Sequence, residues 1–308
     1  MQEGIRFYKN IDVVNPIMIA AWPGMGNVAL GTVDYIRRKM RAVRFAQVLT
    51  DPLAALDSVD VKGGVSKLPK TPLNTFYYTK NSDLIIFEGE VQLPGRSGID
   101  LLNKVLRVAS DLKVSKIFTA AALPTPISHK DFSDVYAVAN KESLRDGLKD
   151  YGMKIMDGGH ISGLNGLMLG FAAKNRIDAT CLLATIPQYA IGLPNPKASR
   201  AIIDCLNNTL NISVDVRELD GYIKEMDQRM AIIEDKVRDV ITIDEEPLES
   251  YTHHQTQTPD YIVKRIEKLF IEARDDRKKA SSLKSELDRW NLYGAYEDRF
   301  LDLFKENQ

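Results

Sequence analysis

Cysteine, net charge and long apolar runs are all scarce in this chain of 308 residues. Its two cysteines, Cys181 and Cys205, provide neither a disulfide framework nor a cysteine-based zinc site. The 41 Lys and Arg residues are balanced by 42 Asp and Glu residues, so no excess of basic charge favours nucleic acid or an anionic membrane surface. No run reaches the roughly 18 uninterrupted apolar residues that a membrane span requires. We therefore expect a cytoplasmic protein that binds neither nucleic acid nor membrane.

The density of charge along the chain changes near residue 216. Residues 217–308 contain 38 charged side chains in 92 positions, whereas residues 1–216 contain 45. A shift of this size indicates a change of architecture rather than a binding patch. With 44% hydrophobic and 27% charged residues, the composition is that of an ordinary globular protein. We predict an α/β domain over 1–216 and a helical extension over 217–308.

The first region alternates short apolar runs with segments of helical periodicity, which is typical of a mainly parallel sheet flanked by helices. Buried strands are predicted at 16–22, 44–49, 83–87, 116–123 and 179–186. Crossover helices are predicted at 28–40, 99–109, 141–151, 163–175 and 196–210. Residues 64–68 and 75–79 are predicted to form an antiparallel pair of exposed strands.

The extension has a different periodicity. From Leu219 to Val240 its apolar residues follow one another at alternating spacings of four and three, as in a coiled-coil seam. After a break that ends at Pro259, a second seam runs from Ile262 to Trp290. This pattern predicts two long helices that form an antiparallel hairpin. Helices packed flat on the α/β domain are the alternative, but the narrow stripe favours a protruding, coiled-coil-like element.

A glycine-rich turn, Pro23-Gly24-Met25-Gly26-Asn27, follows the first buried strand. Backbone N–H groups at such a turn and the dipole of the next helix can hold an anion, so Gly24, Met25, Gly26 and Asn27 are candidate ligand-binding residues. Their spacing with Ala29 also fits a dinucleotide site. A structural turn explains the glycines equally well, and the lysine of a phosphate-binding P-loop is missing. Dinucleotide binding, another small anion and a purely structural turn therefore remain as alternatives.

Two further segments contribute candidate ligand-binding residues. Glu88 and Glu90 follow a predicted core strand at the carboxyl edge, where open α/β sheets bind ligands. His160 and Asn165 belong to a second glycine-rich cluster, 157–166, which could form a backbone nest. The alternatives are a solvated loop for the two carboxylates and, for the cluster, glycines at 163, 166 and 170 that let a helix approach the sheet closely.

Signals for catalysis or for a metal are weak. Neither His129 nor His160 has a second histidine at metal-ligand spacing, and the adjacent histidines at 253 and 254 lie in a polar linker. No Gly-x-Ser-x-Gly motif and no nucleophilic cysteine context is present. We therefore predict no catalytic residue, no metal and no cofactor. The sequence leaves enzymatic activity open and favours a non-enzymatic protein.

Three longer blocks carry a more specific signal. They are 16–27 (PIMIAAWPGMGN), 159–170 (GHISGLNGLMLG), and 184–189 (ATIPQY) leading to 194–199 (PNPKAS). In sequence, order and separation they resemble the proteasome assembly chaperone 2 family. The resemblance implies an α/β sandwich similar to nucleoside phosphorylases, a homo-oligomer, and no established catalysis. The helical extension is similar to the variable C-terminal part of longer prokaryotic members.

The same resemblance bears on partners. Eukaryotic relatives chaperone the assembly of proteasome α-rings, and some archaeal relatives dock on proteasome rings through a C-terminal hydrophobic-Tyr-any tripeptide. This sequence ends in Glu306, Asn307 and Gln308, so we expect no docking by that route.

These observations favour a non-catalytic, self-associating protein that acts in protein interaction or assembly. A homotrimer is the first expectation for its oligomer, and the hairpin over 217–308 is the expected contact with another protein. The competing hypothesis is a protein or enzyme that binds a nucleotide or other small anion at 24–27.

Overall fold

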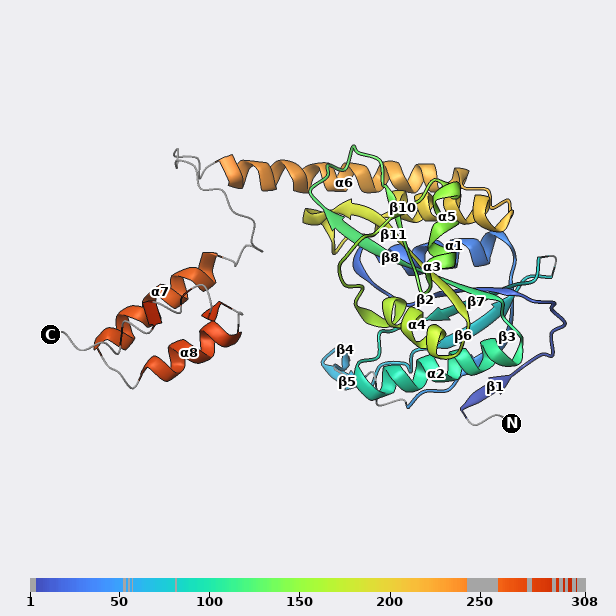
Figure 1. Ribbon diagram of the computed structural model, residues 1–308, viewed down its shortest axis with the longest axis horizontal. Coiled ribbons are helices and arrows are strands. Elements are labelled where there is room, and N and C mark those ends of the chain that lie inside the picture. The colour runs from blue at the N-terminus through green and yellow to red at the C-terminus, as the bar shows by residue number, and fades with distance from the viewer. Residues whose placement is uncertain are drawn as a thin grey trace. The chain divides into compact units, whose positions relative to one another are not determined.

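The computed structural model describes residues 4–242 and 260–303, except 52, 53, 55, 57, 81, 276–278, 290, 291, 294, 295, 297, 298, 301 and 302 (Figure 1). The contacts within the chain divide it into two compact units, Met1–Asp244 and Glu245–Gln308. The predicted break between the two helical seams, including both histidines of the linker, lies outside the described residues.

The first unit is built on a nine-stranded sheet with the order β1-β3-β6-β7-β2-β8-β11-β9-β10. Its strands are β1 (Ile5–Phe7), β2 (Ile17–Ala21), β3 (Val43–Val48), β6 (Asn74–Tyr78), β7 (Leu84–Gly89), β8 (Lys116–Thr125), β9 (Val135–Ala139), β10 (Lys154–Ile155) and β11 (Asp178–Pro187). The four central strands, β7, β2, β8 and β11, are parallel, and antiparallel strands join on both sides. This arrangement confirms the predicted α/β fold.

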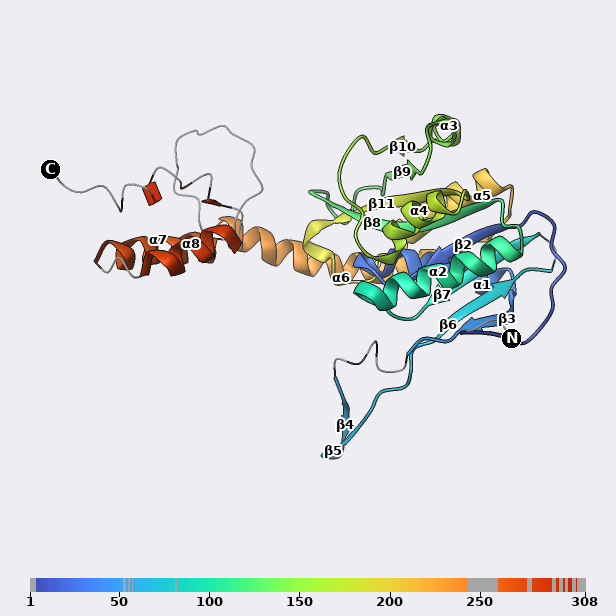
Figure 2. The same cartoon turned by 60° about the horizontal axis from the view of Figure 1, so that its bottom comes forward.

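Helices cover both faces of the sheet. They are α1 (Val28–Lys39), α2 (Gly95–Asp111), α3 (Glu142–Asp146), α4 (Gly163–Lys174), α5 (Pro196–Leu210) and α6 (Arg217–Thr242), with short 3₁₀ turns η1 (Met25–Asn27), η2 (Lys149–Tyr151) and η3 (Gln188–Ala190). Helices α2 and α4 share one apolar core with the sheet, and α1 and α5 share the other (Figure 2). Because successive strand residues point to opposite faces, Met18 contributes to the first core and Ile19 to the second.

One strand prediction was wrong. Strand β5 (Val65–Lys67) pairs with β4 (Asp60–Lys62) in a separate hairpin, whereas β6 is a core strand between β3 and β7. Gly63 and Gly64, with φ of +59° and +77°, form the tight turn that joins β4 to β5. Figure 2 shows this hairpin standing away from the sheet.

Helix α6 packs against its own α/β unit. Leu219, Met226 and Met230 of the predicted seam are buried, and the last two cluster with Ala190 of η3. Farther along the same seam Val237 is 37% exposed. The predicted boundary at 216 therefore precedes α6, whereas the contacts divide the chain at 244.

The second unit contains α7 (Asp260–Asp275) and α8 (Ala280–Arg289). The sequence predicted one long helix here, and the structure has two that pack against each other. Ile266, Phe270, Leu283 and Leu287 are buried in their common core. The apolar residues that recur at spacings of four and three therefore form the interface between α7 and α8.

Candidate functional site

A tight turn joins the carboxyl end of β2 to α1 and contains the predicted anion-binding residues. Gly24 has extended backbone, and η1 follows it directly. Gly26 has a φ of +61° and Asn27 a φ of +47°. A Cβ on Gly26 would lie 3.3 Å from Ile186 Cδ1, so both the left-handed backbone and the tight packing favour glycine at this position.

The backbone groups of this turn are used within the protein. Gly26 N–H donates to the Ile191 carbonyl at 2.8 Å, and Asn195 N–H donates to the Gly26 carbonyl at 2.7 Å. Asn27 N–H donates to the Gly24 carbonyl at 2.9 Å. An anion at a helix N-terminus is held by free N–H groups, and those of Gly26 and Asn27 are already engaged. The segment that follows β11 therefore closes the turn.

The two glycine-rich segments meet through Asn165 of α4. Trp22 N–H donates to Asn165 Oδ1 at 2.9 Å, and Asn165 Nδ2 donates to the Trp22 carbonyl at 3.0 Å. Beside it, Gln92 Nε2 donates to the Pro23 carbonyl at 2.7 Å, and Leu164 N–H donates to Gln92 Oε1 at 3.0 Å. Both side chains fasten the end of β2 to the start of α4, and Asn165 is itself buried.

The remaining candidates on this side of the sheet are open to solvent. A Cβ on Gly24 would lie 3.9 Å from Asn165 Nδ2, so these two predicted residues are neighbours. Met25 is 43% exposed, and Asn27 is exposed as well. His160 is exposed in the loop between β10 and α4.

The two predicted carboxylates have separate structural partners. Glu88 Oε1 lies 2.6 Å from Arg37 Nε of α1. Burial raises the pKa of Glu88 above its usual value, and the hydrogen bond and charge of Arg37 oppose this. Glu90 is exposed, and its Oε2 accepts a hydrogen bond from Leu73 N–H at 2.8 Å. One carboxylate thus holds a helix against the sheet and the other caps the start of β6.

The glycines of α4 have different surroundings. A Cβ on Gly166 would lie 2.2 Å from the Ile161 carbonyl oxygen, and one on Gly163 would lie 3.1 Å from Gln92 Nε2. A Cβ on Gly170 would meet nothing within 4 Å. These glycines were expected to let α4 approach the sheet closely, but the nearest atoms are those of the preceding turn for Gly166 and of Gln92 for Gly163, and Gly170 faces open space.

A cluster that the sequence did not reveal links α6 to the β8–β9 loop. Glu234 Oε2 lies 2.6 Å from His129 Nδ1, and it accepts hydrogen bonds from Tyr189 Oη at 2.5 Å and from Ser128 Oγ at 2.9 Å. Lys197 of α5 adds a hydrogen bond to the His129 carbonyl. His129 was noted in the sequence, but its partner is 105 positions away, and only the three-dimensional packing of α6 brings them together.

The ionisation of this cluster follows from its hydrogen bonds. Burial disfavours the charged form of Glu234, and the hydrogen bonds from Tyr189, His129 and Ser128 outweigh burial and lower its pKa to about 2. Burial and the neighbouring Glu234 both raise the pKa of Tyr189. At neutral pH the cluster therefore contains a carboxylate that accepts several hydrogen bonds and a neutral phenol that donates one of them.

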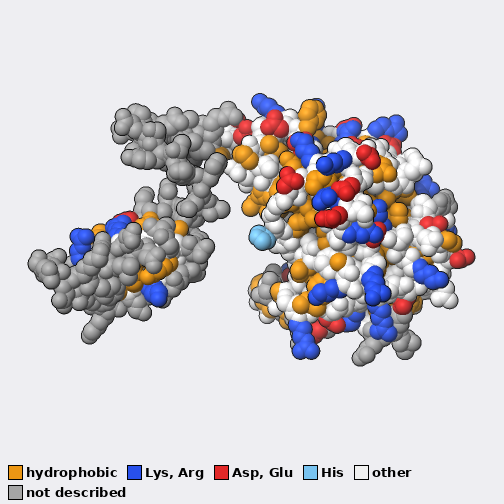
Figure 3. All heavy atoms as spheres, viewed as in Figure 1, with side chains coloured by type: hydrophobic (Ala, Val, Ile, Leu, Met, Phe, Trp, Pro, Cys, Tyr) orange, Lys and Arg blue, Asp and Glu red, His pale blue; other side chains and the backbone are white. Residues whose placement is uncertain are grey.

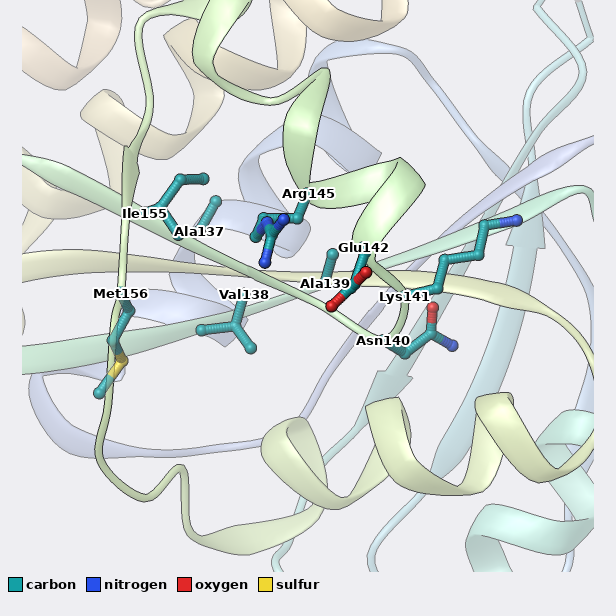
Figure 4. Close-up of a pocket in the computed structure, with 9 residues that line it drawn as sticks. All are labelled: Ala137, Val138, Ala139, Asn140, Lys141, Glu142, Arg145, Ile155 and Met156. Atoms are coloured by element: carbon teal, nitrogen blue, oxygen red, sulfur yellow. The ribbon is translucent and has the colours of Figure 1, made fainter.

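A pocket of about 290 Å³ lies at the edge of the sheet, between β9, β10 and α3 (Figure 4). Residues of β9, Ile155 and Met156 line it together with the polar or charged Asn140, Lys141, Glu142 and Arg145. In Figure 4 the Glu142 side chain points toward the strand residues, and other polar groups come from the start of α3. This pocket is far along the sheet from the glycine-rich turn, because β11 and β8 lie between β9 and β2.

Two classes of site are absent from the part of the chain that the structure describes. No group of three or more His, Cys, Asp or Glu side chains is arranged to hold a metal ion. None of the helices there combines the length and apolar character needed to cross a membrane.

Burial raises the pKa of the Cys181 thiol to about 12, so this cysteine is protonated at neutral pH.

The fold is that of a three-layer α/β protein, and two N–H groups of the turn after β2 form hydrogen bonds within the chain. A model of the PAC2 family matches residues 18–234. The match includes the whole central sheet from β2 to β11 together with most of α6. The chain therefore belongs to the PAC2 family, and the predicted resemblance is confirmed.

Individual relatives are distant. An uncharacterized protein of Methanocaldococcus jannaschii is 23% identical over 227 residues, which cover 72% of this chain and 85% of the relative. The crystal structure of Pyrococcus furiosus PbaB, named as an archaeal proteasome activator, superposes with a TM-score of 0.64 at 23% identity and covers 75% of this chain and 98% of PbaB. Pyrococcus furiosus PbaA, named as an archaeal homolog of proteasome-assembly chaperone, gives a TM-score of 0.59 at 21% identity, with coverages of 76% and 99%. These likenesses show the fold.

Proposed function

We propose that the protein is a non-catalytic, cytoplasmic interaction protein of the assembly-chaperone type, which associates with copies of itself and binds another protein. Membership of the PAC2 family supports this role. PbaB is an archaeal proteasome activator and PbaA a homolog of proteasome-assembly chaperone, and the similarity to them suggests that the other protein belongs to the proteasome machinery. A trimer remains the first expectation for the number of copies.

The proposal depends chiefly on the turn at the carboxyl end of β2, where backbone groups are bonded and apolar side chains are exposed. The backbone groups that would hold an anion at Gly26 and Asn27 bond within the protein. Two apolar side chains of the same bonded segments are exposed: Met25 is 43% exposed and Ile191 is 46% exposed. An edge that is closed to small anions and carries apolar side chains is suited to contact with a protein surface.

The carboxyl-terminal end of α6, beginning at Val237, is the proposed contact with the other protein. Earlier in the helix Met226 and Met230 are buried against η3 and Glu234 anchors it to the β8–β9 loop, and the same seam continues to the partly exposed Val237. Figure 1 shows α6 extending past the end of the sheet. An apolar seam that becomes partly exposed toward the end of its helix is suited to pack against a helix of a partner.

The direct test combines mass measurement with binding to a defined partner. Light scattering of the purified chain should give a mass of several copies, and the chain should co-sediment with a purified archaeal proteasome core particle. A monomer at every concentration, together with no co-sedimentation, would contradict the proposal. An enzymatic turnover of any metabolite would contradict its non-catalytic part.

The competing function is binding of a nucleotide or another small anion at residues 24–27, with Glu88, Glu90, His160 and Asn165 near it. It is tested by thermal unfolding in the presence of nucleotides, phosphate and dinucleotides. A ligand present at 100 times its dissociation constant would stabilise the protein by ~2.7 kcal/mol. We expect no compound to raise the melting temperature, because the turn is closed.

A further inference from the structure

The hairpin of β4 and β5 is a two-stranded sheet apart from the main sheet. Within the described part of the chain its strands pair only with each other, and every residue of both strands is exposed. Val61 is 68% exposed and Val65 is 59% exposed. An isolated two-stranded hairpin is marginally stable in water, and further strands or packing are needed for a stable sheet. The hairpin therefore gains stability when another strand joins one of its edges.

The turn of the hairpin determines which backbone groups face those edges. The turn at 63–64 has two residues, so Lys62 and Val65, which flank it, form the hydrogen-bonded pair that closes it. Hydrogen-bonded and non-hydrogen-bonded pairs alternate along an antiparallel ladder, so the next pair, Val61 and Ser66, is not hydrogen-bonded. The N–H and C=O groups of Val61 therefore point to the free edge of β4, and those of Ser66 point to the free edge of β5.

The charges of the hairpin are incompletely matched. Asp60 lies opposite Lys67 in the ladder, whereas Lys62 lies opposite the uncharged Val65. None of the three charged side chains in these strands forms an ion pair with the part of the chain that the structure describes. Because side chains alternate between the faces of a strand, Asp60 and Lys62 share one face of β4 and Val61 lies on the other. Lys62 is thus the charged residue that has no acidic residue opposite it.

The sequence of β4 is complementary to itself in the antiparallel direction. The strand reads Asp-Val-Lys, and a second copy related by a two-fold axis at Val61 presents Lys-Val-Asp beside it. Each Asp60 then lies opposite Lys62 of the other copy, and the outward N–H and C=O groups of the two Val61 residues bond reciprocally. An in-register parallel pairing of β4 would instead place like charges side by side, and an antiparallel pairing of β5 with itself would place Lys67 beside Val65.

We propose that β4 of one copy pairs antiparallel with β4 of a second copy, so that the two hairpins form a four-stranded sheet with Val61 at its two-fold axis. In this sheet each Asp60 lies between two lysines, Lys67 of its own hairpin and Lys62 of the other copy. Figure 2 shows the hairpin standing away from the main sheet, where a second copy can reach its edge. The inference rests on the self-association in the proposed function and adds that the copies associate in pairs. The number of copies is therefore even, and a trimeric contact elsewhere on the molecule gives six.

The first test removes the outward N–H of β4. Proline has no N–H, so Val61→Pro should abolish the reciprocal hydrogen bonds and halve the mass measured by light scattering and sedimentation. Ser66→Pro is the matched control, because it removes the outward N–H of β5 instead, and its mass should equal that of the unsubstituted chain. Both variants should keep the melting temperature, because no residue of β4 or β5 belongs to either apolar core of the α/β unit.

The second test uses the charges. Asp60→Lys gives β4 two lysines and Lys62→Asp gives it two aspartates, so each variant alone places like charges side by side. Each substitution should raise the dissociation constant of the pair at least about tenfold, measured by sedimentation over a dilution series. An equimolar mixture of the two variants should restore pairing, because every lysine then lies opposite an aspartate of the other variant. A general loss of stability would not be reversed by mixing.

The outcomes separate this inference from the proposed function. An odd number of copies in the unsubstituted protein, an unchanged mass for Val61→Pro, or the same loss of mass for Ser66→Pro would overturn the pairing of β4 and leave self-association intact. A monomeric unsubstituted protein would overturn both. If Val61→Pro keeps its mass but no longer co-sediments with the proteasome core particle, the edge of β4 binds that other protein and the assignment to a second copy is wrong.

Discussion

Asn165 shows how one buried side chain holds two distant segments together. Its amide bonds both backbone groups of Trp22, 143 positions away. The sequence predicted a ligand-binding residue here, because a glycine-rich cluster with a polar side chain fits a nest as well as a structural bond. The residue types could be read from the sequence, but the identity of their partners could not. In the structure both polar atoms of the Asn165 amide bond to the Trp22 backbone.

Replacing Asn165 by Leu should destabilise the protein strongly. The Trp22 N–H and carbonyl would both be left buried without these partners, at a cost of about 1–3 kcal/mol each. Chemical denaturation should therefore show a free energy of unfolding lower by about 2–6 kcal/mol. An exposed asparagine, Asn27, provides the control, and Asn27→Gly should change the free energy of unfolding by less than about 1 kcal/mol. Similar values for both variants would contradict the structural role of Asn165.

Glu234 should make stability depend on pH in the acid range. Its folded pKa of about 2 lies below the usual value, so its stabilising effect is fully present above about pH 5 and is lost as pH falls toward 2. Glu234→Gln should lower the free energy of unfolding by about 1–3 kcal/mol at pH 7, and the gap from the unsubstituted chain should close as pH approaches 2. Denaturation at pH 7, 5, 4 and 3 would measure it. If the difference in unfolding free energy between the two proteins stays constant with pH, ionisation of Glu234 is not its cause.

At the scale of the element, helix α4 offers a matched pair of glycines. Gly166→Ala would place a Cβ 2.2 Å from the Ile161 carbonyl oxygen, so the turn before the helix must shift. Gly170→Ala meets open space and gains helix propensity of up to about 1 kcal/mol. We expect Gly166→Ala to lower the melting temperature and Gly170→Ala to raise it. Equal shifts of the same sign would contradict the described packing of α4.

Strand and helix positions were largely predictable, because buried parallel strands have continuous apolar sequences. The run at 83–87 and strand β7 coincide almost completely. The pairing of 64–68 failed for a local reason: adjacent Gly63 and Gly64 form a two-residue turn, which pairs β5 with the segment before it. Periodicity identifies strands, whereas turn chemistry decides which strands are neighbours.

At the scale of the whole molecule, the seam of α6 has a buried part and a partly exposed part. Met226 is buried against η3, whereas Val237 is 37% exposed. Met226→Asp should therefore lower the melting temperature by several degrees, because it buries a charge. Val237→Asp should leave the melting temperature within about 1 °C and abolish co-sedimentation with the proteasome core particle. Loss of folding in both variants would contradict the division of the seam.

The heptad spacing alone could not separate these two parts. Seven positions from Leu219 to Val240 share one pattern, yet the first part packs against η3 of its own unit. A regular apolar stripe predicts that another surface covers it, but the stripe does not identify that surface. The Glu234 cluster marks the place along α6 where contact with its own unit is anchored by polar groups. On the face shown in Figure 3, Lys and Arg side chains are interspersed with Asp and Glu side chains.

Deep burial of Cys181 has a practical consequence. Its thiol is wholly enclosed, and burial raises the pKa of the half-buried Cys205 to about 11. Neither thiol forms much thiolate at neutral pH, so both should resist alkylation and air oxidation. A cysteine introduced on the surface would then accept a fluorophore or spin label selectively. Distances between two such labels then become measurable without first replacing the native cysteines.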